Sequence, residues 1–223
     1  ENLYQSGAED LKEVAQAFTD SEEVVSQIDQ AQALLPLAKG NMSEVASALL
    51  SSHDSVEDVA EALYYGLDDV GYHDVAVALY DAGEKPTPIA AALNNECFAS
   101  PQEVANALYG LFTLPEVAQG LQSGLGMGDS EIAGTLNSCG HKLSETAYAL
   151  CDRSGICVSP DIIGNILKDG GDMNTDEIVF ALSHPDGLDM TTDQIAISLG
   201  VNERDVEAIF EQANEVGDEP VTW

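Results

Sequence analysis

The sequence predicts an all-α fold, a superhelical array of about fourteen short helices paired into hairpins of about 30 residues. Three observations lead to this prediction. A core of the form [Val/Ile]-Ala-x-Ala-Leu returns about every fifteen residues. Helix start signals precede many of these cores, and glycines follow them. Because the three signals agree from copy to copy, they predict helices rather than strands.

The repeat extends along nearly the whole chain. Four clear copies begin at Val45, Val59, Val75 and Val104. Looser copies begin at Val14, Gln30, Ile89, Val117, Ile132, Thr146, Ile163, Ile178, Ile195 and Val206. Ten steps separate Val45 from Ile195, which lie 150 residues apart, so the mean step is 15 residues.

Each unit has the pattern of one short amphipathic helix. Apolar residues at i, i+1, i+3 and i+4 lie on one helical face and do not alternate as in a strand. A helix of about eight to eleven residues is marginal alone in water, so it must pack against its neighbours. Small alanines let helix axes approach closely, and the larger side chains fill the remaining space. Stacked hairpins then share a continuous core, although a compact bundle of the same helices is an alternative.

Caps and turn residues mark where the units begin and end. Residues 100–103 (Ser-Pro-Gln-Glu) combine a capping box with proline at the first helical position, and residues 55–58 (Ser-Val-Glu-Asp) are similar. Thr-Pro at 87–88 and Ser-Pro at 159–160 indicate two further starts. Glycines shortly after the core leucine are expected to end helices in the left-handed conformation. These are Gly66, Gly83, Gly110, Gly124, Gly140, Gly155, Gly170 and Gly200.

The repeat divides the chain into three segments. Residues 1–7 (Glu-Asn-Leu-Tyr-Gln-Ser-Gly) look like a protease-site remnant from a cloning vector, so we leave them out of the predicted fold. Residues 8–213 form the predicted helical repeat domain, and residues 214–223 form an acidic tail that breaks the repeat. No apolar run is long enough to span a bilayer, and a cytoplasmic location is favoured.

The chain is strongly acidic. It has 40 Asp and Glu against 7 Lys and Arg, a formal net charge of −33 at pH 7, and the basic residues are scattered. Such a chain repels phosphate backbones and anionic lipids, so nucleic acids and membranes are unfavourable partners. A basic protein or peptide is the expected partner. The same composition also suits a protein adapted to high salt.

The segment from about residue 9 to residue 210 resembles the short α-helical repeats of α-solenoid proteins, in both its core and its glycine turns. The resemblance is to this class only, because the longer ankyrin and TPR signatures are absent. It implies a scaffold whose concave face binds proteins, peptides or nucleic acids. It implies no enzymatic activity.

Residues 193–211 resemble a DNA-binding helix-turn-helix, in which the start of the second helix contacts the bases. That start is Asn-Glu-Arg-Asp at 202–205, followed by Glu207 and Glu211, and these carboxylates would repel DNA. We therefore expect a structural repeat here and keep DNA binding as an alternative. A further alternative is a nucleic-acid mimic, in which closely spaced carboxylates occupy a DNA-binding protein.

Asp-rich loops carry the oxygen ligands that calcium prefers, at 68–69, 169–176 and 186–189. The EF-hand pattern fails, however. Counted from Asp172, Glu177 stands at the glycine position and Ser183 at the position of the bidentate glutamate. We expect these residues to act as helix caps and turn formers instead.

The remaining chemistry-bearing residues match no known site. Cys139, His141, Cys151 and Cys157 lack the paired spacing of zinc ligands, although a local disulfide between Cys151 and Cys157 is conceivable. No phosphate-binding loop, nucleophile elbow or metalloprotease motif occurs. The sequence therefore predicts no metal, no cofactor and no enzymatic activity.

Aromatic side chains supply the candidate binding site. Tyrosines recur just after or within the cores, where they either line one face as a binding stripe or cover the hairpin ends. The candidate partner-binding residues are Tyr64, Tyr65, Tyr72, Tyr80, Tyr109, Tyr148 and Trp223. Together with the charge, they predict a non-enzymatic repeat scaffold that binds a basic protein or peptide.

Overall fold

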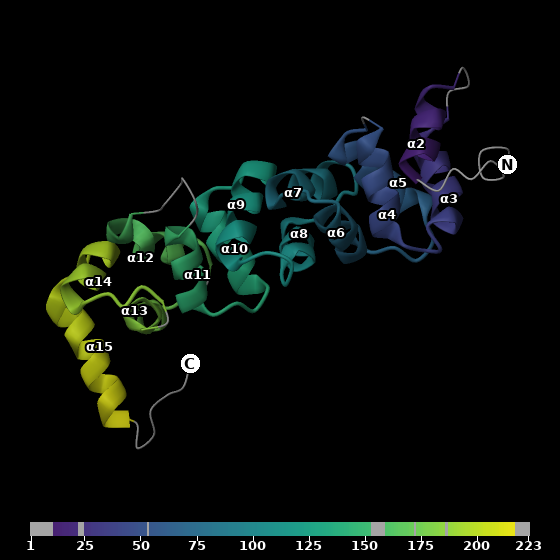
Figure 1. Cartoon of the computed structure of the whole chain (residues 1–223). Helices are drawn as coiled ribbons and strands as arrows, with labels where there is room; N and C mark the ends of the chain where they lie inside the picture. The colour runs from purple at the N-terminus through teal and green to yellow at the C-terminus, as the bar shows by residue number, and fades with distance from the viewer. Residues whose placement is uncertain are drawn as a thin grey trace. The chain divides into compact units, whose positions relative to one another are not determined.

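The computed structural model describes residues 11–21, 25–52, 54–152, 159–171, 173–185 and 187–216. Within these ranges the chain folds into fourteen helices and no strand, as the sequence predicts (Figure 1). The chain divides into two compact units, unit 1 up to Phe112 and unit 2 from Thr113.

Unit 1 contains seven helices among its described residues. They are α2 (Leu11–Thr19), α3 (Gln27–Leu37), α4 (Met42–Ser51), α5 (Val56–Gly66), α6 (Tyr72–Asp81), α7 (Pro86–Asn95) and α8 (Pro101–Leu108). Unit 2 also contains seven in the part that the structure describes. They are α9 (Leu114–Leu125), α10 (Asp129–Ser138), α11 (Leu143–Cys151), α12 (Pro160–Asp169), α13 (Thr175–Ser183), α14 (Thr192–Leu199) and α15 (Glu203–Val216).

Both units follow one packing rule. Each helix contacts the next helix in the chain and the next but one. Even-numbered helices therefore form one layer of a unit and odd-numbered helices form the other, with the hairpins linking the two layers. This is the array of helical hairpins that the repeat predicts.

The repeated core residues lie between the layers. In α5, Val59, Ala60, Ala62 and Leu63 are all fully buried, and the other clear copies are buried to the same degree. Burying one such leucine or valine stabilises the fold by about 1.5–3 kcal/mol, which a single short helix cannot obtain alone.

The predicted helix starts are mostly confirmed. The Ser100 hydroxyl accepts from the Glu103 N–H at 3.4 Å, and the Glu103 carboxylate accepts from the Ser100 N–H at 2.8 Å. Ser55 and Asp58 form the same capping box at the start of α5. The start predicted at Thr87 is wrong, because α7 already begins at Pro86. A proline suits that first position, since its missing N–H would have no helical acceptor.

The prediction of helix ends needs three corrections. Gly83, Gly110, Gly140 and Gly200 adopt positive φ as expected. Gly66, in contrast, is the buried last residue of α5, and α9 continues past Gly124 to Leu125, where Gly126 caps it with φ of 73°. Gly170 follows α12 with an ordinary helical φ of −79°. Close helix contacts explain Gly66 and Gly170, whose missing Cβ atoms leave room for neighbouring backbone. Gly155 lies outside the described residues.

Three turns of unit 1 place a residue other than glycine in the left-handed region. These residues are Lys39, Asp69 and Phe98, with φ of 55°, 58° and 57°. They occupy the α3–α4, α5–α6 and α7–α8 turns, so they lie along the same edge of unit 1. A bulky aromatic residue rarely adopts this conformation, which makes Phe98 unusual.

Candidate functional site

Three of the candidate tyrosines meet in unit 1. Tyr64 and Tyr65 end α5, and Tyr72 begins α6. The Tyr64 ring stacks on the Tyr72 ring, with centroids 5.0 Å apart and planes 10° apart. Tyr65 meets Tyr64 edge to face at 5.0 Å, and 50% of Tyr65 is exposed. We call these three residues the tyrosine patch.

The turn after α7 packs beside the tyrosine patch. Cys97 is buried, and its thiol donates to the Ala60 carbonyl of α5 at 3.7 Å. Burial, together with the nearby carboxylates of Glu96 and Glu61, raises the pKa of Cys97 to about 12. The thiol is therefore protonated at neutral pH and serves packing rather than nucleophilic chemistry.

Carboxylates lie near the tyrosine patch. A hydrogen bond with Tyr64 raises the pKa of Tyr72 to about 12, and Glu103 also contributes. Partial burial raises the pKa of Tyr65, as do nearby negative groups that include Glu61 and Glu96. Neutral rings next to negative charge are the arrangement that attracts an organic cation.

Phe98 projects from the same turn. Its side chain is 78% exposed, although its neighbours Cys97 and Ala99 are buried. The Ala99 N–H donates to the Leu93 carbonyl at 3.0 Å, and the Asn94 amide donates to the Ala99 carbonyl at 2.9 Å. An exposed ring is thus presented from a fixed backbone. The sequence analysis did not predict this exposed ring. The signal was present, because Phe98 stands after α7 at the position that Gly83 takes after α6 and Gly140 takes after α10.

The other candidate aromatics lie elsewhere. Tyr80 lies near the opposite end of α6 from Tyr72 and packs edge to face on Phe112 at 5.1 Å. Tyr109 pairs with Phe112 through an isolated backbone bridge after α8. Tyr148 is on α11 in unit 2, and Trp223 lies outside the described residues. The tyrosines of unit 1 therefore gather near helix ends rather than along one stripe.

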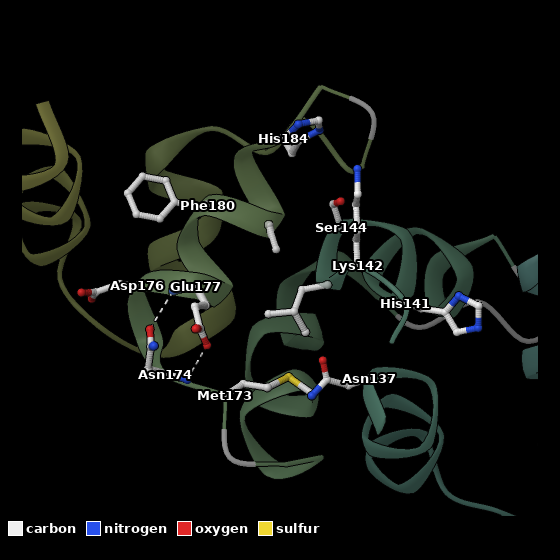
Figure 2. A pocket seen from close by; sticks show the side chains of 12 residues that line it. Asn137, His141, Lys142, Ser144, Met173, Asn174, Asp176, Glu177, Phe180 and His184 are labelled. Carbon is white, nitrogen blue, oxygen red and sulfur yellow. Dashed lines mark hydrogen bonds between the residues drawn. The ribbon is translucent and has the colours of Figure 1, made fainter. Parts of the chain in front are cut away.

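Unit 2 contains a pocket of about 650 Å³ between α11 and α13 (Figure 2). It is lined by Asn137, His141, Lys142, Leu143, Ser144, Met173, Asn174, Asp176, Glu177, Phe180, Ala181 and His184. Burial lowers the pKa of His141, although the carboxylate of Glu145 opposes this shift. Sequence analysis did not predict this pocket.

Two helices and a glycine turn make up most of the segment that resembles a helix-turn-helix. α14 ends at Leu199, Gly200 adopts φ of 66°, and α15 begins at Glu203. Residues 202–205 are all exposed, so the acidic start of α15 faces solvent. α15 continues to Val216, three residues into the segment predicted as a tail.

No metal site emerges from the described part of the chain. Among those residues, no group of three His, Cys, Asp or Glu side chains could hold a metal ion. Cys157 and the loop residues Asp172 and Asp186 lie outside the described ranges. The Cys151–Cys157 disulfide considered above therefore stays a prediction.

Comparisons with known proteins give no family for this chain: no family model, curated protein or solved structure matches it. None of the helices in the described residues is both long and apolar enough to cross a bilayer.

Proposed function

We propose that this chain is a non-enzymatic helical-repeat scaffold that binds a basic protein or peptide at the tyrosine patch. One observation carries the proposal: the half-exposed ring of Tyr65 contacts the Tyr64–Tyr72 stack, and the carboxylates of Glu61, Glu96 and Glu103 lie near these rings. A lysine or arginine of the partner would stack on a ring while its charge faces a carboxylate. A cation–π contact of this kind contributes about 0.5–2 kcal/mol, more as water is excluded.

The charge of the whole chain supports the same partner. A net charge of −33 attracts a basic partner over long range and speeds its association. This attraction is not specific to the tyrosine patch. Affinity and specificity must therefore be separated in any test.

The test uses an arginine-rich peptide of nine residues and measures its affinity by fluorescence anisotropy. Binding should weaken steeply between about 50 and 500 mM salt, because screening shortens to a few ångströms. Tyr65→Ala should weaken binding about fivefold. Tyr148→Ala removes a similarly exposed tyrosine from unit 2 and should leave the affinity unchanged. Equal affinities for the two variants would exclude the tyrosine patch as the site.

Charge variants sharpen this test. One double variant, Glu61→Gln with Glu96→Gln, removes two charges beside the tyrosine patch. The control double variant, Glu203→Gln with Glu207→Gln, removes two charges from the exposed face of α15. The net charge is the same in both double variants. The first pair should weaken peptide binding more than the second if the site is at the patch.

DNA binding through residues 193–211 is the alternative from another class. It predicts a gel shift of duplex DNA at low salt that Arg204→Ala abolishes, since Arg204 is the basic residue at the start of α15. The exposed carboxylates around Arg204 argue against this outcome. A nucleic-acid mimic would instead compete with DNA for a basic DNA-binding protein.

A further inference from the structure

A buried hydroxyl opens into the pocket of unit 2. Ser144, the second residue of α11, is only 8% exposed and lines the pocket. Its hydroxyl lies at the pocket wall, where a bound ligand can reach it. A hydroxyl in this position can donate a hydrogen bond to an acceptor of the ligand.

Nitrogen donors gather at the same end of the pocket. Figure 2 shows that the Lys142 side chain extends towards this end, where Ser144 and His184 also lie. The N-terminus of α11 lies here as well, but the Glu145 carboxylate caps it by accepting from the Lys142 N–H at 3.4 Å, so the Lys142 ammonium is the group that would hold an anion. His141 also lines the pocket, but Figure 2 shows its ring away from this end, so Lys142 and His184 are the nitrogen groups found here. This end thus favours an anion within an acidic protein.

The rest of the pocket is different in character. Leu143, Met173 and Phe180 supply apolar surface, and Phe180 packs edge to face on Phe210 at 5.6 Å, which restrains its ring. Glu177 caps α13 by accepting from the Asn174 N–H at 3.3 Å. Asp176 lies beside it. These two carboxylates would repel an anion from their side of the pocket.

We propose that this pocket binds a carboxylate attached to an apolar body. The carboxylate would accept from the Ser144 hydroxyl and the Lys142 ammonium, and the apolar body would lie against Met173 and Phe180. A pocket of about 650 Å³ suits a small organic acid or the last residues of a peptide. The site is in unit 2 and does not depend on the tyrosine patch.

The test compares three probes with the same eight-carbon chain: octanoate, octanol and octylammonium. Binding to the full chain is followed by the NMR shifts of the backbone amides of Leu143, Ser144 and Phe180. The overall charge of −33 favours the cation everywhere else on the protein. Octanoate should nevertheless bind here about tenfold more tightly than octylammonium, because of its charge-assisted hydrogen bonds. If octylammonium binds these residues more tightly, the proposal is wrong.

Two variants locate the carboxylate. Lys142→Met should weaken octanoate binding about tenfold, whereas Lys168→Met, which removes an exposed lysine of α12, should not. Ser144→Ala should weaken octanoate binding and leave octanol binding unchanged, with a shift pattern that shows an intact fold. Unchanged octanoate affinity in both pocket variants would overturn the proposal.

Peptides distinguish the two sources of the carboxylate. Gly-Gly-Leu has a free carboxylate and an apolar last side chain, and its C-terminal amide removes only the charge. If the free peptide binds as tightly as octanoate and the amide does not, the ligand is a peptide C-terminus. If octanoate alone binds, the ligand is a free organic acid. Either result supports the carboxylate site, and the absence of both overturns it.

Discussion

Units 1 and 2 share one repeat period but differ in the small residues between their helices. In unit 1, α4 to α8 keep [Val/Ile]-Ala-x-Ala-Leu without exception. In unit 2, every helix from α9 to α14 changes at least one of these positions, for example Gly120, Thr146, Gly164 and Ser198, and α10 has a glycine, Gly134, at the variable third position. The period alone therefore sets the number and order of helices. The small residues decide how closely helices approach and which polar groups become buried.

Glycine allows the closest approach in unit 2. A Cβ atom on Gly134 of α10 would overlap the carbonyl oxygen of Gly170, just after α12. At Gly164, a Cβ would lie 2.8 Å from the Ser198 hydroxyl, which accepts from the Gly164 N–H at 2.6 Å. Gly164 stands where α4 to α8 have alanine, and Gly134 stands at the variable position of the repeat.

The largest expected effect tests this difference. Gly134→Ala should destabilise the protein by about 3 kcal/mol, because the added methyl group meets backbone that cannot move aside. The intrinsic preference of alanine for helices would predict the opposite sign. Asn106→Ala changes the same repeat position in α8, where the side chain is exposed, and should stay within about 0.5 kcal/mol. Urea denaturation followed by circular dichroism measures both, and equal effects would remove the contrast between the units.

The second prediction concerns a buried polar group. Thr146 of α11 stands where unit 1 has valine, is fully buried, and has no hydrogen-bond partner for its hydroxyl among the described residues. Thr146→Val should therefore stabilise the protein by about 1–2 kcal/mol. The reverse exchange in unit 1, Val59→Thr, should destabilise it by a similar amount. A destabilised Thr146→Val variant would show that the hydroxyl has a partner.

The third prediction concerns the left-handed turn of unit 1. Phe98→Gly should stabilise the protein by about 0.5–1 kcal/mol, because it relieves the backbone while losing almost no burial. Gly83→Ala, at φ of 100° after α6, should destabilise it instead. If Phe98→Gly also weakens binding of the arginine-rich peptide, the phenylalanine is retained for binding at the expense of stability.

The smallest effect is a pH dependence in unit 2. Burial lowers the pKa of His141 below its usual 6.5, so the unfolded chain binds a proton more readily than the folded chain. The contribution of neutral His141 to the free energy of unfolding is therefore fully present above pH 6.5. It is lost as the pH falls through the lower pKa of the folded state. His141→Gln should reduce this loss between pH 7 and pH 5, as measured by thermal unfolding. Identical pH profiles for both proteins would contradict the assignment.

The helices could be predicted from the sequence because their caps and apolar cores are local signals. Ser100 and Glu103, for example, lie three residues apart and form their capping box without help from the rest of the chain. The tyrosine patch was partly accessible, since Tyr64 and Tyr65 precede Tyr72 across a single turn. The pocket was not, because Ser144 and Phe180 are brought together only by the packing of α11 against α13.

The equivalent turns of unit 1 make its hairpins interchangeable. Lys39, Asp69 and Phe98 share nearly the same φ and are 30 and 29 residues apart. Removing residues 40–69 would join α3 to α6 through a turn of the existing kind and keep every remaining helix in its own layer. Duplicating the same segment would add one hairpin. The length of such a protein can thus change in whole modules, by gene duplication or by engineering, without inventing a new connection.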